Sequence, residues 1–191
     1  MADIWNLDEY GKYFAVHVFH VEKPIDVNGL LETLREASNG MDVQVVDLDR
    51  IAGKRHLYFA MLNAVHSFQR GMNISRTLAV EFLLYASTQK QISEAIRIMG
   101  VDQNTRNLLV VAIGGDKESV KRFADRLPLL TNSRNDTSLL DQWSEKKIQN
   151  LISLFKINEK EIATMSGEKT SMEETVQKLI LERVALLPTV V

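Results

Sequence analysis

The chain contains no cysteine, only three prolines and nine glycines, and no apolar run that approaches the roughly 18 residues of a membrane-spanning helix. Without cysteine the protein cannot form a disulfide, a thiol nucleophile or a thiolate metal site. The low proline and glycine content, with 25% charged residues, excludes a disordered or low-complexity chain. The N-terminus lacks the basic-then-apolar order of a signal peptide, so we expect a cytoplasmic protein with no membrane partner.

Length and composition predict a single domain over residues 1–191. With 191 residues and 45% hydrophobic side chains, the chain is large enough to bury most of its apolar surface in one core. Apolar runs rich in β-branched residues predict strands, and apolar stripes at helical spacing predict helices. The expected strands cover residues 14–20, 43–48 and 108–113, and the expected helices cover 27–38, 54–69, 76–85, 88–100, 117–127, 139–155 and 172–187.

These elements predict an α+β, or mixed α/β, fold with a small and mostly antiparallel central sheet. Three to four strands would pack with six to eight helices. Ser75 and either Ser87 or Thr88 are the expected N-caps of the two central helices, and Thr170 opens a capping box before the last helix. Residues 128–136 are expected to form a loop.

Residues that could form a catalytic centre are few. His17 and His20 lie three apart in an expected strand, so their side chains point to opposite faces and cannot share a metal. Asp47 and Asp49 are more typical of a solvated strand end than of a cation site. Residues 114–116 lack the glycine spacing and the lysine of a phosphate loop. We therefore expect no catalytic residue, no metal and no cofactor.

Acidic residues are absent between Arg50 and Val80, although this segment carries five cations. The other 18 basic side chains of the protein are outnumbered by its 25 acidic ones. A cationic segment in an otherwise acidic chain favours a polyanionic partner. A gap of this length also arises by chance, so the charge alone leaves the function open. The five cations are Arg50, Lys54, Arg55, Arg70 and Arg76.

The expected helix 54–69 has an unusual outer face. Opposite its core stripe it carries Arg55, Phe59, Leu62, His66 and, one residue later, Arg70. Cations interleaved with aromatic and aliphatic side chains are typical of a surface that binds single-stranded nucleic acid or a protein groove. The alternative is that another element of the same domain covers this face, with the cations reaching solvent at its edges.

Four stretches of the sequence closely resemble one family. They are Ile51-Ala-Gly-Lys-Arg-His-Leu, Asn73-Ile-Ser-Arg-Thr-Leu-Ala-Val-Glu-Phe-Leu-Leu-Tyr-Ala-Ser, Gln89-Lys-Gln-Ile-Ser-Glu-Ala-Ile-Arg-Ile-Met-Gly and Leu181-Glu-Arg-Val-Ala-Leu-Leu. The chain resembles the small KEOPS subunit that binds the kinase-like ATPase of that complex, the TPRKB type or Cgi family, in its archaeal form. The resemblance covers about residues 43–111 and the last twenty residues, and residues 128–169 look like a family-specific insertion.

This resemblance implies a non-catalytic regulatory subunit of KEOPS, the complex that makes threonylcarbamoyladenosine in tRNA. Such a subunit binds and stimulates the kinase-like ATPase directly and meets the threonylcarbamoyl-transferase subunit only within the complex. Archaeal members also hold the single-stranded 3′ CCA end of tRNA. Carried onto this chain, the RNA-binding candidates are Lys54, Arg55, Arg70, Asn73, Arg76, Gln89, Lys90 and Gln91. For Gln89 and Gln91 an equal alternative is a helix N-terminus that satisfies its own backbone.

The expected kinase-facing surface lies on the C-terminal helix. Leu181, Val184 and Ala185 lie off its core stripe, on a flank that would otherwise be solvated. The partner-binding candidates are Leu181, Val184, Ala185 and Leu187. Two other classes of function stay open, namely a protein-interaction domain without RNA contact and a small stand-alone hydrolase that uses the histidines and aspartates above.

Overall fold

The computed structural model describes residues 2–165 and 170–189. Within them, four strands form one antiparallel sheet in the order β1-β2-β4-β3. The strands are β1 (Asp3–Leu7), β2 (Lys12–His20), β3 (Asp42–Asp47) and β4 (Asn107–Gly114). The α-helices in the same residues are α1 (Val27–Ala37), α2 (Gly53–Gln69), α3 (Leu78–Ser87), α4 (Ile92–Met99), α5 (Lys117–Leu130), α6 (Glu145–Leu154), α7 (Glu159–Met165) and α8 (Met172–Leu186). The predicted fold class is confirmed.

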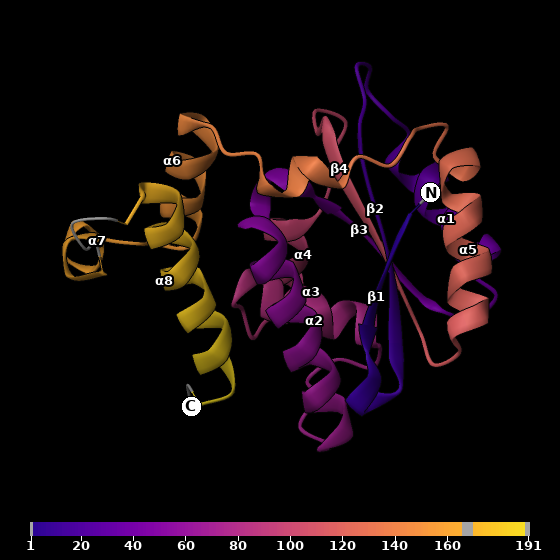
Figure 1. The fold of residues 1–191 in the computed structure, drawn as a ribbon, viewed down its shortest axis with the longest axis horizontal. Helices are drawn as coiled ribbons and strands as arrows, with labels where there is room; N and C mark the ends of the chain where they lie inside the picture. The colour runs from indigo at the N-terminus through magenta and orange to yellow at the C-terminus, as the bar shows by residue number, and fades with distance from the viewer. Residues whose placement is uncertain (1, 166–169, 190–191) are drawn as a thin grey trace.

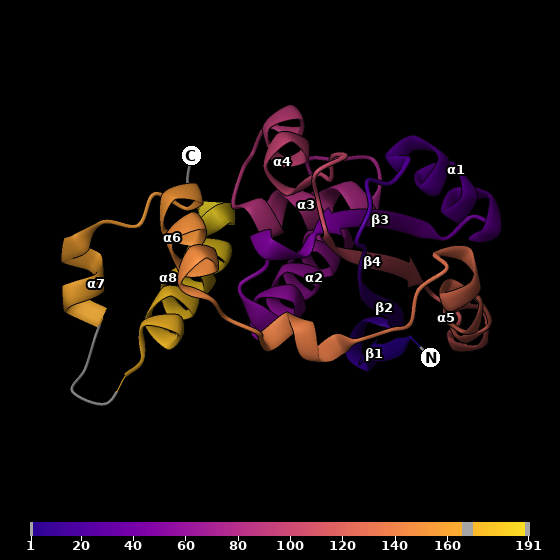
Figure 2. The same ribbon diagram turned by 90° about the horizontal axis from the view of Figure 1, so that it is seen from above.

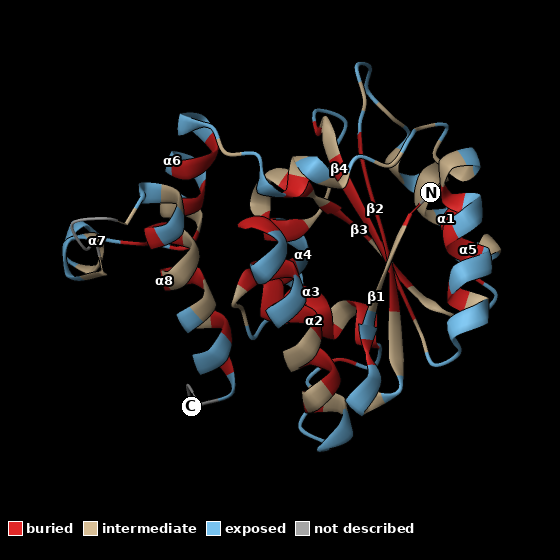
Figure 3. Cartoon of the chain, viewed as in Figure 1, coloured by how far each residue is buried: buried red, intermediate tan, exposed pale blue. Residues whose placement is uncertain are grey.

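Both faces of the sheet are buried, because β2 alternates apolar side chains between two cores. Phe14, Val16 and Val18 point into the core shared with α2, α3 and α8. Ala15 and Phe19 point into a second core shared with α1 and α5. The result is a sheet between two helical layers, with α6, α7 and α8 outside α2 (Figures 1 and 2). Figure 3 shows buried residues along the strands and on the inner sides of α2 and α3.

The two central helices begin later than predicted. The side chain of Thr77 caps α3 by accepting from the backbone N–H of Val80, whereas the Ser75 hydroxyl is held by Glu81. Thr88 adopts the left-handed conformation (φ 55°) and ends α3, so it cannot start the next helix. Ser87, the alternative cap, is still the last residue of α3, and α4 starts at Ile92. Both predicted N-caps are therefore wrong.

The C-terminal half also differs from expectation. The predicted helix 139–155 is a 3₁₀ turn at Thr137–Asp141 followed by α6, and the predicted loop begins inside α5, which includes Pro128. Ser171, one residue after the predicted cap, accepts from the backbone N–H of Glu174 and caps α8. The short elements β1 and α7 were missed. No helix within the described residues is long and apolar enough to cross a membrane.

Residues 131–144 carry the chain from α5 across the sheet edge to α6 (Figures 1 and 2). They pass β2 beyond the first residue of β1, Asp3, which pairs with Val16. There the backbone N–H of Val18 donates to the Asn135 side chain at 2.8 Å, and the Val18 carbonyl accepts from the N–H of Asp136 at 2.7 Å. Asp141 then accepts from the backbone N–H of Lys54 at the start of α2. The crossing therefore places the C-terminal helices beside α2. That residues 128–169 are a family-specific insertion stays a prediction.

Candidate functional site

The cationic segment of the sequence does not form one patch in space. Arg55 lies in the first turn of α2, and Arg70 follows its last residue. Fifteen residues at 1.5 Å per residue separate them by about 22 Å along the helix. Lys54 lies at the far end too, where its ammonium is 3.3 Å from the carboxylate of Asp141. The structure therefore separates two of the predicted RNA-binding residues from the others.

At the opposite end of α2 the surface is hollowed. This first hollow has a volume of about 390 Å³ and lies between the end of α2, the flank of α3 and the end of α8. It brings together Arg70 and Lys90, predicted to bind RNA, with Ala185 and Leu187, predicted to bind a partner. Residues assigned to two separate surfaces by sequence thus line the same depression.

Charge and apolar surface meet in the first hollow. Among the described residues, neither Arg70 nor Lys90 forms an ion pair. Met72 and Ile74, from the loop between α2 and α3, line the same hollow and are 59% and 50% exposed. Unpaired cations suit phosphate groups, and exposed apolar side chains suit the faces of unstacked bases.

The loop between α2 and α3 is held by one buried carboxylate. Glu81, on the first turn of α3, accepts hydrogen bonds from the backbone N–H groups of Ile74 (3.1 Å) and Ser75 (2.8 Å). It also accepts from the hydroxyls of Ser67 and Ser75. Sequence reasoning missed this residue, although Glu81 is the lone charged side chain in the run Leu78–Ser87. An isolated acid in an apolar helix signals a buried hydrogen-bonding role.

The other predicted RNA-binding residues lie in the loops before and after α3 and do not line the first hollow. The Asn73 amide donates to the carbonyl of Ser75, so it shapes the α2–α3 loop, in which Arg76 is exposed. The Gln89 amide donates to the carbonyl of Ser87 at 3.4 Å, at the C-terminal end of α3 and not at the helix N-terminus that the alternative assumed. Gln91 is exposed at the N-cap of α4 without a side-chain capping bond.

A second hollow of about 430 Å³ adjoins the first and shares Lys90 and Leu187 with it. It lies where α3, α6 and α8 end. Its apolar lining includes Phe155 and Leu186, and Lys156 supplies a further cation. None of these three residues was singled out from the sequence, because they belong to segments that only the packing of α6 and α8 brings next to Lys90.

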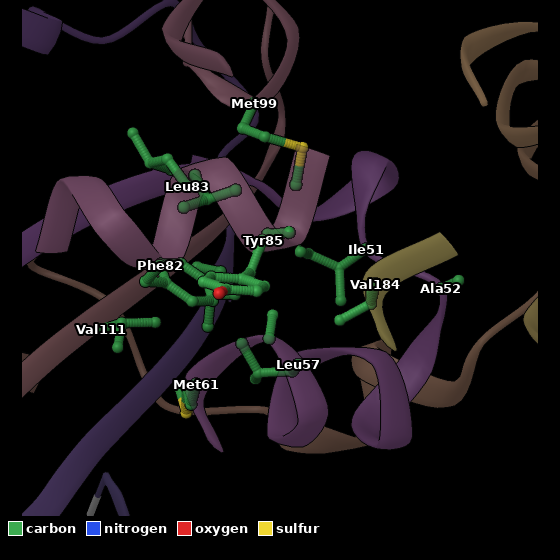
Figure 4. Close-up of a cluster of buried hydrophobic side chains, with 14 of the residues drawn as sticks. Ile51, Ala52, Leu57, Met61, Phe82, Leu83, Tyr85, Met99, Val111 and Val184 are labelled. Carbon is green, nitrogen blue, oxygen red and sulfur yellow. The ribbon is translucent and has the colours of Figure 1, made fainter. Parts of the chain in front are cut away.

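Two of the predicted partner-binding residues are buried. Val184 is fully buried and lies beside Ile51 in the core between α2 and α3 (Figure 4), and Leu187 is also buried. The expectation that Val184 lies on a solvated flank is wrong, because Ile180 and Val184, four residues apart, share the row that packs on α2. Leu181 is half-buried and Ala185 is exposed, so these two stay candidates.

The residues considered for catalysis serve the fold. His17 and His20 both lie in β2, three residues apart, so they face opposite sides of the sheet as predicted. His17 is buried and His20 is exposed. Burial lowers the pKa of His17 to about 4. Asp47 caps the 3₁₀ turn Leu48–Arg50 and pairs with Arg50 at 3.1 Å, and burial raises its pKa. In the described part of the chain, no group of three or more His, Cys, Asp or Glu side chains is placed to hold a metal.

The site therefore defines a binding protein of α+β fold, whose surface combines unpaired cations with exposed apolar side chains. Residues 22–187 match the model of the family described as kinase binding protein CGI-121. This match covers most of the chain, so the chain belongs to the CGI-121 family, and the resemblance seen in the sequence is confirmed.

Two curated relatives span both eukaryotes and archaea. The chain is 26% identical over 145 residues to the EKC/KEOPS complex subunit cgi121 of Schizosaccharomyces pombe, covering 76% of this chain and 79% of the relative. It is 29% identical over 118 residues to the regulatory protein Cgi121 of Methanocaldococcus jannaschii, covering 62% of this chain and 72% of the relative.

Proposed function

We propose that this chain is a non-catalytic regulatory subunit of the KEOPS complex, which binds the kinase-like ATPase and holds the 3′ CCA end of tRNA in the first hollow. Membership of a kinase-binding family and the names of the two relatives support the first part. The observation that carries the second part is the first hollow itself, where Arg70 and Lys90 lie beside the exposed Met72 and Ile74. The complex modifies tRNA to carry threonylcarbamoyladenosine, and its transferase subunit is an indirect partner.

A single-stranded end suits this hollow better than a duplex. Its bases are already unstacked, so their faces can contact apolar side chains without the cost of opening a helix. Few cations are needed, because only the phosphates of a few nucleotides approach them. The same hollow would not follow a duplex backbone, because Arg55, at the other end of α2, lies about 22 Å from Arg70 along the helix.

Charge reversal at Arg70 tests the RNA site. We expect Arg70→Glu to weaken binding of intact tRNA at least about tenfold, because it removes one phosphate contact and adds repulsion. Arg55→Glu is the matched control: Arg55 is an exposed cation on the same helix, at its far end. Anisotropy titrations with intact tRNA and with tRNA lacking the CCA end measure both effects. Equal affinity for intact and trimmed tRNA in the unmodified protein would refute the assignment.

The kinase surface is proposed on the outer flank of α8, at Leu181 and Ala185. These residues lie four apart, so they form one row of that helix. We expect Leu181→Asp to weaken binding of the purified kinase-like subunit at least about tenfold, because a charge would be desolvated at the interface. Leu129→Asp, at a leucine 83% exposed on α5, should leave the affinity unchanged. Calorimetric titration measures both, and equal affinities for the two variants would remove α8 from the interface.

A further inference from the structure

The two hollows adjoin each other, because Lys90 and Leu187 line both of them. The first hollow measures about 390 Å³ and the second about 430 Å³. Ligand pockets in proteins span about 300–1,000 Å³, so each hollow is near the lower end of that range. Each is suited to one small ring system, and only the two together match a longer ligand.

The second hollow has the same mixture of groups as the first. Leu186 lines it and is 47% exposed, and Phe155 forms part of its wall. Arg183 also lines it, but its guanidinium is committed to Glu161 at 2.7 Å and to the carbonyl of Leu179. Lys90 and Lys156 are the cations of this hollow that form no ion pair with any described residue.

Helix ends provide an alternative reason for these two lysines. Both α3 and α6 end at the second hollow, each next to a residue in the left-handed conformation: Thr88 (φ 55°) and Lys156 (φ 53°). A helix C-terminus carries about half a negative charge, which a nearby lysine offsets. The helix ends therefore explain why lysines lie here. They do not explain why Leu186 is half exposed in an apolar hollow, or why Lys90 lines both hollows.

We infer that the site takes two consecutive nucleotides, with one base in each hollow and the phosphodiester that joins them beside Lys90, which lines both. This inference rests on the proposed RNA function and assigns a second base site to Leu186, Phe155 and Lys156. The phosphate that joins two bases lies between them, which is where Lys90 is placed between the hollows. Apolar side chains accept any base face, so the second site adds affinity with little sequence preference.

The inference predicts how affinity grows with ligand length. We expect the dinucleotide CpA to bind at least about tenfold more tightly than adenosine monophosphate, because only the dinucleotide fills both hollows. Leu186→Asp should abolish this gain, because it places a carboxylate in the second hollow. Lys90→Gln should reduce the gain, and Ile74→Asp, in the first hollow alone, should weaken both ligands. Titrations followed by amide chemical shifts detect binding at millimolar affinity.

The outcomes separate this inference from the proposed function. The second base site is overturned if the dinucleotide binds no more tightly than the mononucleotide, or if Leu186→Asp keeps the same gain in affinity. Neither result would contradict RNA binding in the first hollow. Leu186→Asp that weakens kinase binding but not RNA binding assigns the second hollow to the protein partner, which also overturns it. Failure of every oligonucleotide to bind the unmodified protein refutes the proposed RNA function itself. Leu129→Asp is the control for an added surface carboxylate.

Discussion

Replacing Glu81 by alanine is expected to lower the free energy of unfolding by about 3 kcal/mol, because it leaves several buried hydrogen-bond donors without an acceptor. The carboxylate accepts from two backbone N–H groups and two hydroxyls, at 2.8 to 3.2 Å. The hydroxyls can turn to other acceptors, and the Ser75 hydroxyl has the carbonyl of Thr77 at 2.7 Å as an alternative acceptor. The N–H groups of Ile74 and Ser75 cannot turn, so they account for most of the loss.

The same change should release the α2–α3 loop. Ile74 lines the first hollow, and Glu81 fixes its backbone, so Glu81 acts on the ligand through the loop that it positions. Glu81→Gln keeps the shape and one carbonyl oxygen but replaces the other acceptor by a donor. We expect Glu81→Gln to lower the free energy of unfolding about half as much as Glu81→Ala does. Urea unfolding measures the stability, and hydrogen exchange at the amides of Ile74 and Ser75 measures the loop.

A surface carboxylate provides the control for this prediction. Glu94 on α4 pairs with Arg97 in the same helix, within one turn and at the surface. Its replacement by alanine should change the free energy of unfolding far less than Glu81→Ala does, because solvent screens an exposed ion pair. If Glu81→Ala were as mild as Glu94→Ala, and amide exchange at Ile74 and Ser75 stayed slow, Glu81 would have no positioning role.

Much of the fold could be predicted because its signals are local. Strands β2 and β4 are mostly apolar runs of nine and eight residues, and the shorter β3 carries three valines. Strand β4 pairs with both of the others. Strand β1 escaped prediction because Asp3–Leu7 mixes polar and apolar residues and pairs only with β2. The start of α3 was misplaced because Ser75 and Thr77 are equally good caps by type. The choice between them depends on Glu81, which a local pattern does not reveal.

The site was harder to predict because it depends on distances between elements. Neighbouring cations in the sequence suggested one patch, but a straight helix keeps Arg55 and Arg70 about 22 Å apart. The packing of α3 on α2 brings Lys90 to the hollow that Arg70 lines, although twenty positions separate them. Val184 was misassigned for a related reason: α8 buries two neighbouring rows against the core, whereas a single stripe was assumed.

Acidification is expected to destabilise the protein through His56, a buried histidine that links three helices. Its Nδ1 accepts from the backbone N–H of Ala52 at 3.0 Å, so that nitrogen carries no proton. Its Nε2–H donates to the carbonyl of Ala86 at the end of α3. The ring edge also packs on Phe155 after α6, with centroids 5.7 Å apart. Protonation at Nδ1 would break the first bond and leave a charge buried between these elements.

The lowered pKa of His56 determines whether the protein gains or loses stability as the pH falls. Burial lowers the pKa of His56 from 6.5 to about 4, so the folded protein favours the neutral imidazole. The stabilisation is fully present above about pH 6.5 and is lost as the pH falls towards about 4. The difference of 2.5 in pKa, at about 1.4 kcal/mol for each unit, corresponds to a loss of about 3.5 kcal/mol. His17, also lowered to about 4, adds to the same decline.

Comparing the protein with His56→Gln isolates this contribution. At pH 7.5 we expect the variant to be about 2 kcal/mol less stable, because glutamine cannot replace both hydrogen bonds in the same geometry. The difference should shrink as the pH approaches 4.5, since only the unmodified protein has His56 to protonate; His17 and the carboxylates titrate in both. Urea unfolding at pH 7.5, 6.5, 5.5 and 4.5 measures the difference, with His20→Gln, at the exposed histidine, as the control. A constant difference in stability across this range, or a His56 imidazole that titrates near 6.5 by nuclear magnetic resonance, would show that the stabilisation by His56 does not depend on a neutral ring.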